Sequence, residues 1–254
     1  MLPPEIIGHI FSFLQSDFTI LARCSQVHPI LSPHAERLLY ADIVVFDETR
    51  HYPSDCRKFS ATKLHKLLTK SPHIANYIRK LEIHLCLLLS GGSADEIAPI
   101  LPMLSQLRSI SVTSDVKGHY WPNLSARFRD TFINCLSSSN SVLKEVAINS
   151  LYDFPLHVLD GCETVKTISL CGTAKYHENN LQVMPHPILD SLSLHRWWHY
   201  MDSTFLAWAR KHIHSLRSLS LGSNGIDVLP ELVRVCSNSL RDLDWYITGE
   251  LRKF

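Results

Sequence analysis

Apolar residues recur along most of the chain in one short pattern, in which a second apolar residue follows the first by three positions and a third follows by two more. Seven segments fit this pattern, with apolar residues Ile78/Leu81/Ile83, Leu107/Ile110/Val112, Leu143/Val146/Ile148, Val165/Ile168/Leu170, Leu189/Leu192/Leu194, Leu216/Leu219/Leu221 and Leu240/Leu243/Trp245. The intervals between first positions are 29, 36, 22, 24, 27 and 24 residues, with a mean of 27. Alternation of apolar and polar positions over such short segments predicts β-strands that are buried on one face.

The residue after the first apolar position is basic in six of the seven segments. These residues are Arg79, Arg108, Lys144, Lys166, Asp190, Arg217 and Arg241. Lys and Arg together make up only 25 of the 254 residues, so chance does not explain the spacing and the basic position together. The seven segments are therefore predicted to be repeats of one structural unit.

Helical patterns, with apolar residues three and four positions apart, lie between the predicted strands. They cover residues 61–70, 95–104, 126–136, 203–213 and 228–237. A unit of strand followed by helix predicts an α/β fold, in which the strands stack into a curved parallel sheet and the helices cover its convex side. The second and third apolar positions of each strand are expected to face the helices, while the residues between them face the open side.

This arrangement resembles the leucine-rich-repeat family over about residues 74–254, as a degenerate member. The segment from Leu216 to Ile226 keeps the asparagine of that family at Asn224, whereas the other repeats have different residues there. The resemblance implies a solenoid that binds other proteins. The stretch from 47 to 73 is then interpreted as a linker followed by the first helix of the repeat region.

The first 46 residues have a different, purely helical pattern. Prolines at 3 and 4, followed by Glu5, suit the first turn of a helix whose apolar residues Ile6, Ile10 and Leu14 share a face. A second helix is predicted after Asp17, over residues 18–27, and a third over residues 34–43. Three short helices form a unit that is too small to build a sizeable core, so it is expected to need a partner or the repeats.

This helical unit, residues 1–46, resembles an F-box of the type common in fungal proteins. The resemblance rests on Leu2-Pro3-x-Glu5-Ile6, on the apolar positions that follow, and on the stretch from Cys24 to Val27. It implies docking on the Skp adaptor of a cullin-based ubiquitin ligase. By position, the adaptor surface or its support would comprise Leu2, Pro3, Ile6, Ile10, Leu14, Leu21, Cys24 and Val27.

The sequence departs from this family at residues 27–31, where many F-boxes have a cysteine, a basic residue and a tryptophan after the valine. The alternative interpretation of residues 1–46 is a plain three-helix cap on the repeats, because terminal repeats need capping.

Composition excludes several classes of protein. With 45% hydrophobic residues, 19% charged residues and a net charge of +1, the chain has no overall field that would attract nucleic acid or an anionic membrane. No apolar run approaches the about 20 residues needed to span a bilayer. A signal peptide begins with a basic region, whereas the first Lys or Arg of this chain is Arg23. The seven cysteines form no C-x-x-C pair, which favours reduced thiols in the cytoplasm or nucleus.

No catalytic motif is found, since H-E-x-x-H, P-loop, G-x-S-x-G and G-x-G-x-x-G are all missing from the sequence. We therefore expect neither an enzyme nor a cofactor. His195 and His199, with His212 and His214 further on, have only a weak metal-ligand spacing, so structural or surface roles are predicted and no metal.

The basic position has two interpretations. Stacked cations along one edge of the sheet could bind an acidic or phosphorylated segment of a partner. Alternatively, each cation compensates the free carbonyl groups at a helix C-terminus, which is the favoured explanation because every repeat would need the same compensation.

Large aromatic residues follow the strands rather than lying within them. Loops that leave parallel strands emerge at one edge, so these residues are predicted to share a substrate-binding rim. The candidates for this rim are Tyr120, Trp121, Arg196, Trp198, Tyr200 and Tyr246, while Trp197 is expected to plug its own repeat.

The sequence as a whole predicts a substrate receptor of a Skp-cullin-F-box ubiquitin ligase, in which one end of the chain binds the adaptor and the repeats bind an unidentified protein. The alternative is a repeat scaffold that binds proteins without ubiquitination.

Overall fold

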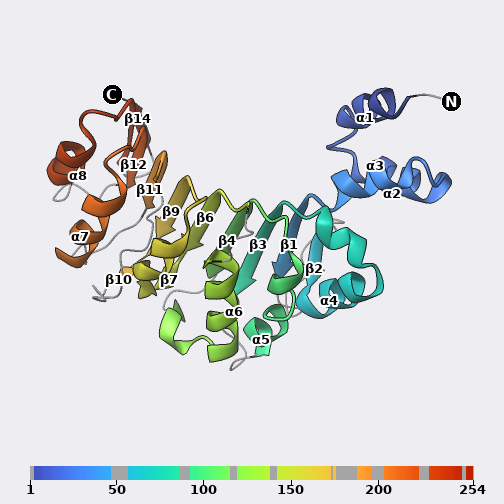
Figure 1. Ribbon diagram of the computed structural model, residues 1–254, viewed down its shortest axis with the longest axis horizontal. Helices are drawn as coiled ribbons and strands as arrows, with labels where there is room; N and C mark the ends of the chain where they lie inside the picture. Colours follow the sequence, from blue (N-terminus) through green and yellow to red (C-terminus); the bar gives the residue numbers. More distant parts are fainter. Residues whose placement is uncertain are drawn as a thin grey trace.

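The computed structural model describes residues 3–46, 57–85, 92–114, 119–137, 142–172, 174–175, 188–195, 203–222, 229–247 and 250–253. Its core is one long sheet with strands in the order β14-β13-β12-β11-β9-β6-β4-β3-β1-β2, as Figure 1 shows. All neighbouring strands are parallel except β13 and β14, which are antiparallel. The strands of this sheet are β1 (Asp42–Phe46), β2 (Lys58–Ser60), β3 (Lys80–Leu85), β4 (Ser109–Ser114), β6 (Glu145–Asn149), β9 (Thr167–Cys171), β11 (Ser191–His195), β12 (Ser218–Gly222), β13 (Asp242–Ile247) and β14 (Glu250–Lys253).

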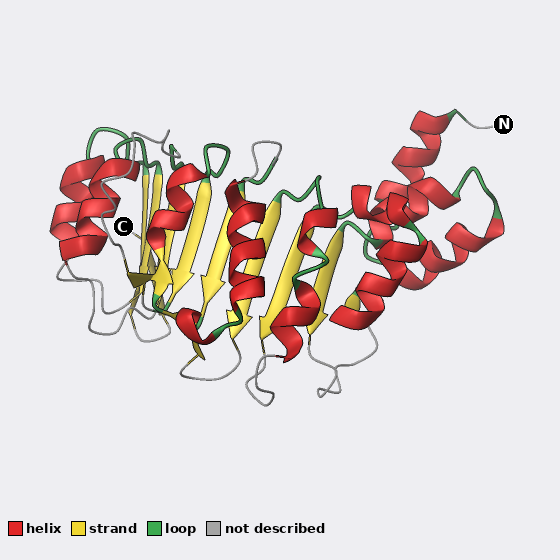
Figure 2. Cartoon of the chain, turned by 60° about the horizontal axis from the view of Figure 1, so that its bottom comes forward, coloured by secondary structure: helices red, strands yellow, loops and turns green. Residues whose placement is uncertain are grey.

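Helices cover one face of this sheet, and Figure 2 shows them in front of the strands. They are α4 (Ala61–Lys70), α5 (Gly92–Ile97), α6 (Ala126–Ser137), α7 (Ser203–His212) and α8 (Leu229–Cys236), with the 3₁₀ helices η1 (Pro72–Asn76), η2 (Leu101–Met103), η3 (Trp121–Asn123) and η4 (Leu156–Gly161). Two small parallel pairs join β5 (His119–Tyr120) to β7 (Leu151–Tyr152) and β8 (Phe154–Pro155) to β10 (Ala174–Lys175). The α/β class and the parallel sheet are therefore as the sequence predicts.

The seven predicted strands pair in the predicted register. Leu81 pairs with Ile110, and the equivalent residue of each further strand follows in the same row as far as Leu243. From β3 to β12 both apolar positions of each strand are at most 2% exposed, because they face the covering helices. The repeat interval is thus set by stacking equivalent apolar side chains into one continuous core.

The helices differ in length with the chain available between strands. The 36-residue interval before Leu143 contains α6, the longest of the described helices, whereas the 22-residue interval before Val165 contains η4 as its only helix. The helix expected over residues 95–104 is wrong as a single element, since α5 ends at Ile97 and η2 follows. Pro99 and Pro102 explain the break, because a proline removes an N–H donor and clashes with the preceding turn.

The N-terminal helices are α1 (Pro4–Ser12), α2 (Phe18–Val27) and α3 (Ser32–Leu39), which stand at one end of the sheet in Figure 1. The Oδ1 atom of Asp17 accepts a hydrogen bond from the N–H of Ile20 and so caps α2, as its position before the helix predicts. The expectation that the third helix continues to residue 43 is wrong. It ends at Leu39, and β1 begins at Asp42 because the run Ile43-Val44-Val45 is β-branched.

β1 adds an eighth strand of the same register to the seven predicted ones. Ile43 pairs with Leu81 and Val45 with Ile83, so Tyr40 stands where the other repeats have their first apolar residue. Tyr40 packs against both the core of the sheet and the core of the N-terminal helices. The sheet thus begins within the 46 residues that the sequence pattern assigns to the helical unit.

Within the described residues, no helix combines the length and the apolar character needed to cross a bilayer.

Candidate protein-binding surfaces

Helix α1 carries apolar side chains on two faces. Ile7 and Phe11 are 6% and 4% exposed, and they pack with Leu21, Ala35 and Leu39 into a small core. On the other face Ile6 and Ile10 are each 46% exposed, and Phe13, just after the helix, is 74% exposed. A helix that is apolar on one face alone would already satisfy this core, so the second face is available for a partner.

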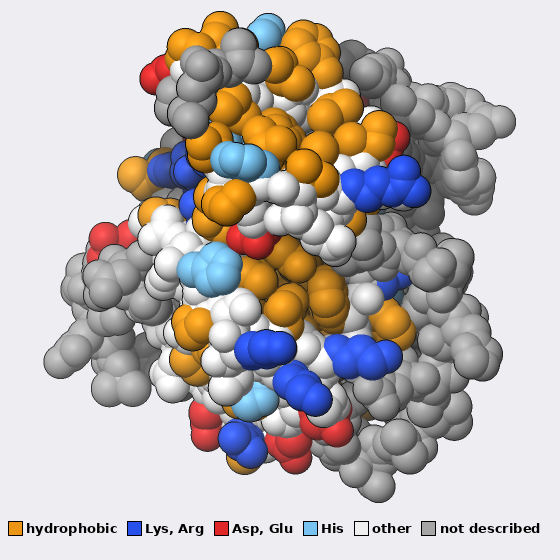
Figure 3. Space-filling view, turned by 90° about the vertical axis from the view of Figure 1, so that its right-hand side faces the viewer, with side chains coloured by type: hydrophobic (Ala, Val, Ile, Leu, Met, Phe, Trp, Pro, Cys, Tyr) orange, Lys and Arg blue, Asp and Glu red, His pale blue; other side chains and the backbone are white. Residues whose placement is uncertain are grey.

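Exposed apolar residues continue onto α2 and the turn after it. Ile20, Val27 and Ile30 are 40%, 73% and 36% exposed. Six of the nine large hydrophobic residues exposed among those described therefore lie between residues 6 and 30. Figure 3 looks at this end of the molecule and shows hydrophobic side chains gathered in its upper part. We call this set the apolar end surface: Ile6, Ile10, Phe13, Ile20, Val27 and Ile30.

Polar and aromatic contacts hold the N-terminal helices against the sheet. The guanidinium carbon of Arg57, just before β2, lies 4.0 Å from the centre of the Phe18 ring, which is a cation–π contact. His73 Nε2 lies 3.2 Å from Glu36 Oε2, which links η1 to α3. The rings of Tyr40 and Phe59 are 6.5 Å apart. These contacts fix the direction in which the apolar end surface faces.

The residues predicted to bind the adaptor divide into an exposed and a buried group. Pro3, Ile6, Ile10 and Val27 are exposed, whereas Leu14 and Cys24 are half-buried against the core of the N-terminal helices. Leu21 is 0% exposed, so it supports this surface from within. Leu2 lies outside the described residues.

Three residues of the apolar end surface were not predicted from the sequence, namely Phe13, Ile20 and Ile30. Phe13 had a readable signal, because Ile6, Ile10 and Phe13 follow one another by four and three positions, which is one stripe of a helix. Ile20 and Val27 are seven apart on α2 and share a face in the same way.

Two residues of the predicted substrate rim, Tyr120 and Trp121, have side chains that the structure describes. Tyr120 is 44% exposed on β5, and its ring lies 5.6 Å from that of Tyr152 on β7. Trp121 is 4% exposed, so its placement on an exposed rim is wrong. Its ring lies 5.7 Å from Phe132 of α6 and 5.1 Å from Phe154 of β8, edge to face, so these aromatic rings bury it.

The side chains of the other rim candidates are not among those that the structure describes. Arg196, Trp198 and Tyr200 lie outside the described residues, as does Trp197. The backbone of Tyr246 belongs to β13, where it pairs with Gly222 and Leu251. Their role in substrate binding stays a prediction.

The basic positions form one row along the edge where the strands begin, which is the upper edge in Figure 2. The carbonyl of Ala41 accepts the N–H groups of Arg79 and Lys80 at 2.8 and 2.9 Å. Each residue of the row accepts two N–H groups from the next repeat in the same way, from Arg79 through to Arg217. We call this set the edge row: Arg79, Arg108, Lys144, Lys166, Asp190, Arg217 and Arg241. Adjacent members are one strand apart, about 4.8 Å along the sheet.

Several titratable groups of the repeat region are buried or paired. Burial raises the pKa of the Cys135 thiol to about 11 and that of Cys162 to about 12, so both thiols stay protonated near neutral pH. His212 is fully buried and its Nε2 lies 3.0 Å from Asp160 Oδ1. On the open face of the sheet, partial burial of His195 on β11 lowers the pKa of its imidazole, which favours the neutral form.

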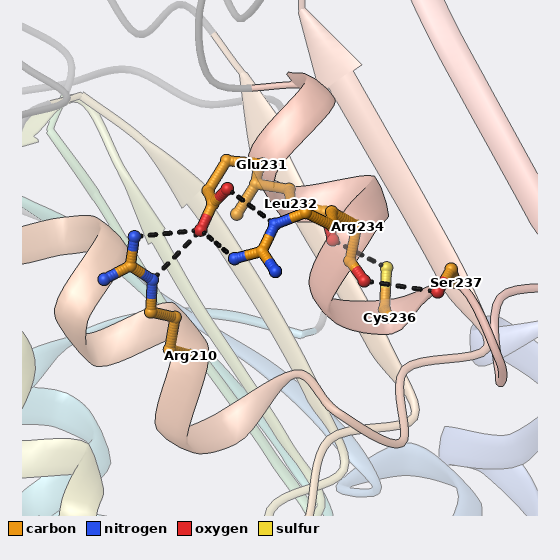
Figure 4. Close-up of polar contacts among 6 residues, drawn as sticks. All are labelled: Arg210, Glu231, Leu232, Arg234, Cys236 and Ser237. Atoms are coloured by element: carbon orange, nitrogen blue, oxygen red, sulfur yellow. Dashed lines mark hydrogen bonds and ion pairs between the residues drawn. The ribbon is translucent and has the colours of Figure 1, made fainter.

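Helices α7 and α8 are joined by a cluster of charges shown in Figure 4. Arg210 donates to Glu231 from Nε at 3.0 Å and from Nη2 at 2.9 Å, and Arg234 donates at 3.0 and 2.8 Å. The hydrogen bonds from Arg234 and then Arg210 lower the pKa of Glu231 to about 2. Because these charges satisfy one another, the cluster is a structural link between helices.

Comparison with models of known protein families, and with the sequences of curated proteins, gave no match.

Proposed function

We propose that this chain is the substrate-recognition subunit of a Skp-cullin-F-box ubiquitin ligase. In this proposal residues 1–46 are an F-box that binds the Skp adaptor, and the strand and helix units are degenerate leucine-rich repeats that bind a protein substrate. The observation that carries the proposal is the apolar end surface, because it gathers exposed apolar side chains on the same helices that resemble an F-box.

The apolar end surface favours a bound partner on energetic grounds. Each Å² of apolar surface removed from water contributes about 25 cal/mol, so Phe13 and Val27, at 74% and 73% exposed, leave much stabilisation unused in the isolated chain. Contiguous exposed apolar surface in a folded protein commonly marks an interaction site. The core beneath, built on Ile7, Phe11 and Leu21, holds together the helices that carry these outer side chains.

The repeats support the second half of the proposal. Their regular sheet holds the open face and the edge row on a rigid frame, and such extended surfaces suit protein recognition. A receptor of this kind brings its substrate to a ligase and performs no chemistry itself.

The test is a pull-down of the full chain with purified Skp adaptor. In the variant Ile10→Asp/Phe13→Asp, two exposed residues become charged, and a charge placed in an apolar interface without a partner is strongly unfavourable. We expect adaptor binding to fall by at least about tenfold while circular dichroism and the unfolding transition stay those of the wild type.

The matched control is Val142→Asp/Ile188→Asp, which makes the same changes at residues 39% and 50% exposed in the repeat region. This control should bind the adaptor normally. Equal binding by all three proteins would contradict the proposed surface. If the wild-type chain itself does not bind the adaptor, the scaffold that acts without ubiquitination is the better explanation.

A further inference from the structure

The edge row is a line of cations with few partners. Six of its seven members are Lys or Arg, and Arg108, Lys144, Arg217 and Arg241 are exposed. Within the part of the chain that the structure describes, these four side chains make no ion pair or hydrogen bond. The exposed carboxylate of Glu145, next to Lys144 in sequence, likewise forms no ion pair among the described residues.

Among the described residues, side-chain hydrogen bonds identify a structural role for two members of the row. Arg79 Nη1 donates to the carbonyl of Gln106 at 3.2 Å, and Lys166 Nζ donates to the carbonyl of Ile188 at 3.2 Å. Each acceptor lies two residues before the next member of the row, so both bonds stabilise the loop of the following repeat. Compensation of carbonyl groups, the explanation favoured by the sequence, therefore accounts for two of the six cations.

Like charges act on one another at the end of the row where Arg79 lies. The pKa of Arg79 is lowered first by burial and then by the positive charges of Arg108 and of Arg37 on α3. Arg37 thus adds to the positive potential at the end of the row nearest the N-terminal helices. Binding of an anionic partner would reduce the electrostatic repulsion within such a row of like charges.

The spacing of the row favours a helix over an extended strand in that partner. From Arg79 to Lys166 four cations follow one another at about 4.8 Å per strand. Acidic residues on one face of a helix recur every turn, about 5.4 Å, so the mismatch over three steps is about 2 Å, which flexible Lys and Arg side chains can absorb. On an extended strand, side chains of one face recur at about 6.7 Å, and the mismatch grows to about 6 Å.

A nucleic acid fits less well. The row is one cation wide, Asp190 interrupts it, and the whole chain has a net charge of only +1. Nucleic-acid surfaces are more strongly basic and commonly interleave aromatic side chains for base stacking.

We propose that the edge row binds the acidic face of a helix in a protein partner, laid along the edge where the strands begin. This site lies in the repeats and does not depend on adaptor docking, so the two proposals can fail separately.

The probe is a fluorescent 18-residue Ala-Glu helical peptide with glutamates alternately three and four positions apart, and binding to the full chain is measured by anisotropy. The variant Arg108→Gln/Lys144→Gln should weaken binding about threefold or more. The control Lys70→Gln/Arg127→Gln removes the same charge from exposed sites on α4 and α6 and should leave binding unchanged. Asp190→Lys, which makes the row continuous, should strengthen binding.

Three further results would overturn the proposal. The first is equal weakening by the edge-row variant and its control, because attraction would then be general. The second is equal binding of a peptide with the same composition but with glutamates distributed around the helix. The third is tighter binding of a single-stranded oligothymidine, which would identify a nucleic-acid surface. Adaptor pull-down by each variant should match the wild type, so loss of peptide binding is not confused with loss of the F-box function.

Discussion

Large aliphatic side chains are buried in the sheet, whereas several of them are exposed on the N-terminal helices. Ile168 on β9 is 0% exposed between neighbouring strands and helices, whereas Ile10 on α1 is 46% exposed. In the sheet every repeat has a neighbour on each side that covers its apolar residues. The three N-terminal helices have a core of only a few residues, and their outer apolar face has no such neighbour within the described part of the chain.

This difference distinguishes side chains that stabilise the fold from side chains that are available to bind a partner. Buried apolar residues of the sheet are explained by the fold, because removing them would open cavities. Exposed apolar residues of the N-terminal helices are not explained by the fold, because α1 already packs through Ile7 and Phe11. The region with the smaller core is therefore the region to which our proposal assigns a partner.

Buried and exposed apolar side chains also lie next to each other in the repeat region, at two neighbouring aromatic residues for which we predict the largest effect. Trp121→Ala should lower the free energy of unfolding by about 3–5 kcal/mol, because its ring is buried against three phenylalanines. Tyr120→Ala should cost less than about 1.5 kcal/mol, since it loses mainly the contact with Tyr152. Chemical denaturation of both variants measures the difference. If Tyr120→Ala proved the more damaging, the assignment of Trp121 to the core would be wrong.

A second comparison tests the strand register with two adjacent residues of β12. Leu219 is 0% exposed and faces the helices, so Leu219→Ala should cost about 2–5 kcal/mol. Ser220 is 7% exposed, and its Oγ makes no hydrogen bond within the described structure. Ser220→Ala should therefore be close to neutral or slightly stabilising, because it removes an unsatisfied buried hydroxyl. Thermal and urea unfolding would reveal a register error as a reversed order of the two variants.

Much of the repeat region could be predicted because one periodicity determines it. The stacking of equivalent apolar positions requires a constant spacing within each strand, and all seven predicted strands form with that spacing. β1 was not predicted because residues 34–43 were interpreted as a third helix, and because its first apolar position is the aromatic Tyr40, whereas the seven predicted segments have an aliphatic residue there. An aromatic residue at the first position, like Trp245 at the third, fits the same strand pattern.

The candidate surfaces were harder to predict, since exposure depends on packing between distant elements. The apolar stripes of α1 were visible in the sequence, but only the positions of Leu21, Ala35 and Leu39 decide that Ile7 and Phe11 face inward. Trp121 follows a strand as a rim residue would, yet Phe154, thirty-three residues later, provides the surface that buries it. Local patterns do not contain such contacts.

The smallest predicted effect concerns the charges that join α7 and α8, the part of the helix layer furthest along the chain from the N-terminal helices. Glu231 has a pKa lowered to about 2 by hydrogen bonds from Arg234 and Arg210, against an ordinary value of 4.5. A carboxyl group whose pKa is depressed on folding stabilises the fold above its unfolded pKa, and that contribution is lost as the pH falls through the folded value.

We therefore expect Glu231→Gln to have a slightly lower melting temperature than the wild type at pH 6, with a difference that shrinks between pH 4.5 and about 2. The effect stays small because the cluster is exposed to solvent, where screening weakens ion pairs. Glu163→Gln is the matched control, since Glu163 is exposed and forms no ion pair among the described residues. Melting curves for the two variants across this range should diverge at pH 6 and meet in acid. Curves that stay parallel would show that the two arginines do not hold Glu231 in its charged form, and the last helix pair would then be held by apolar contacts, among them those of Leu232 and Cys236.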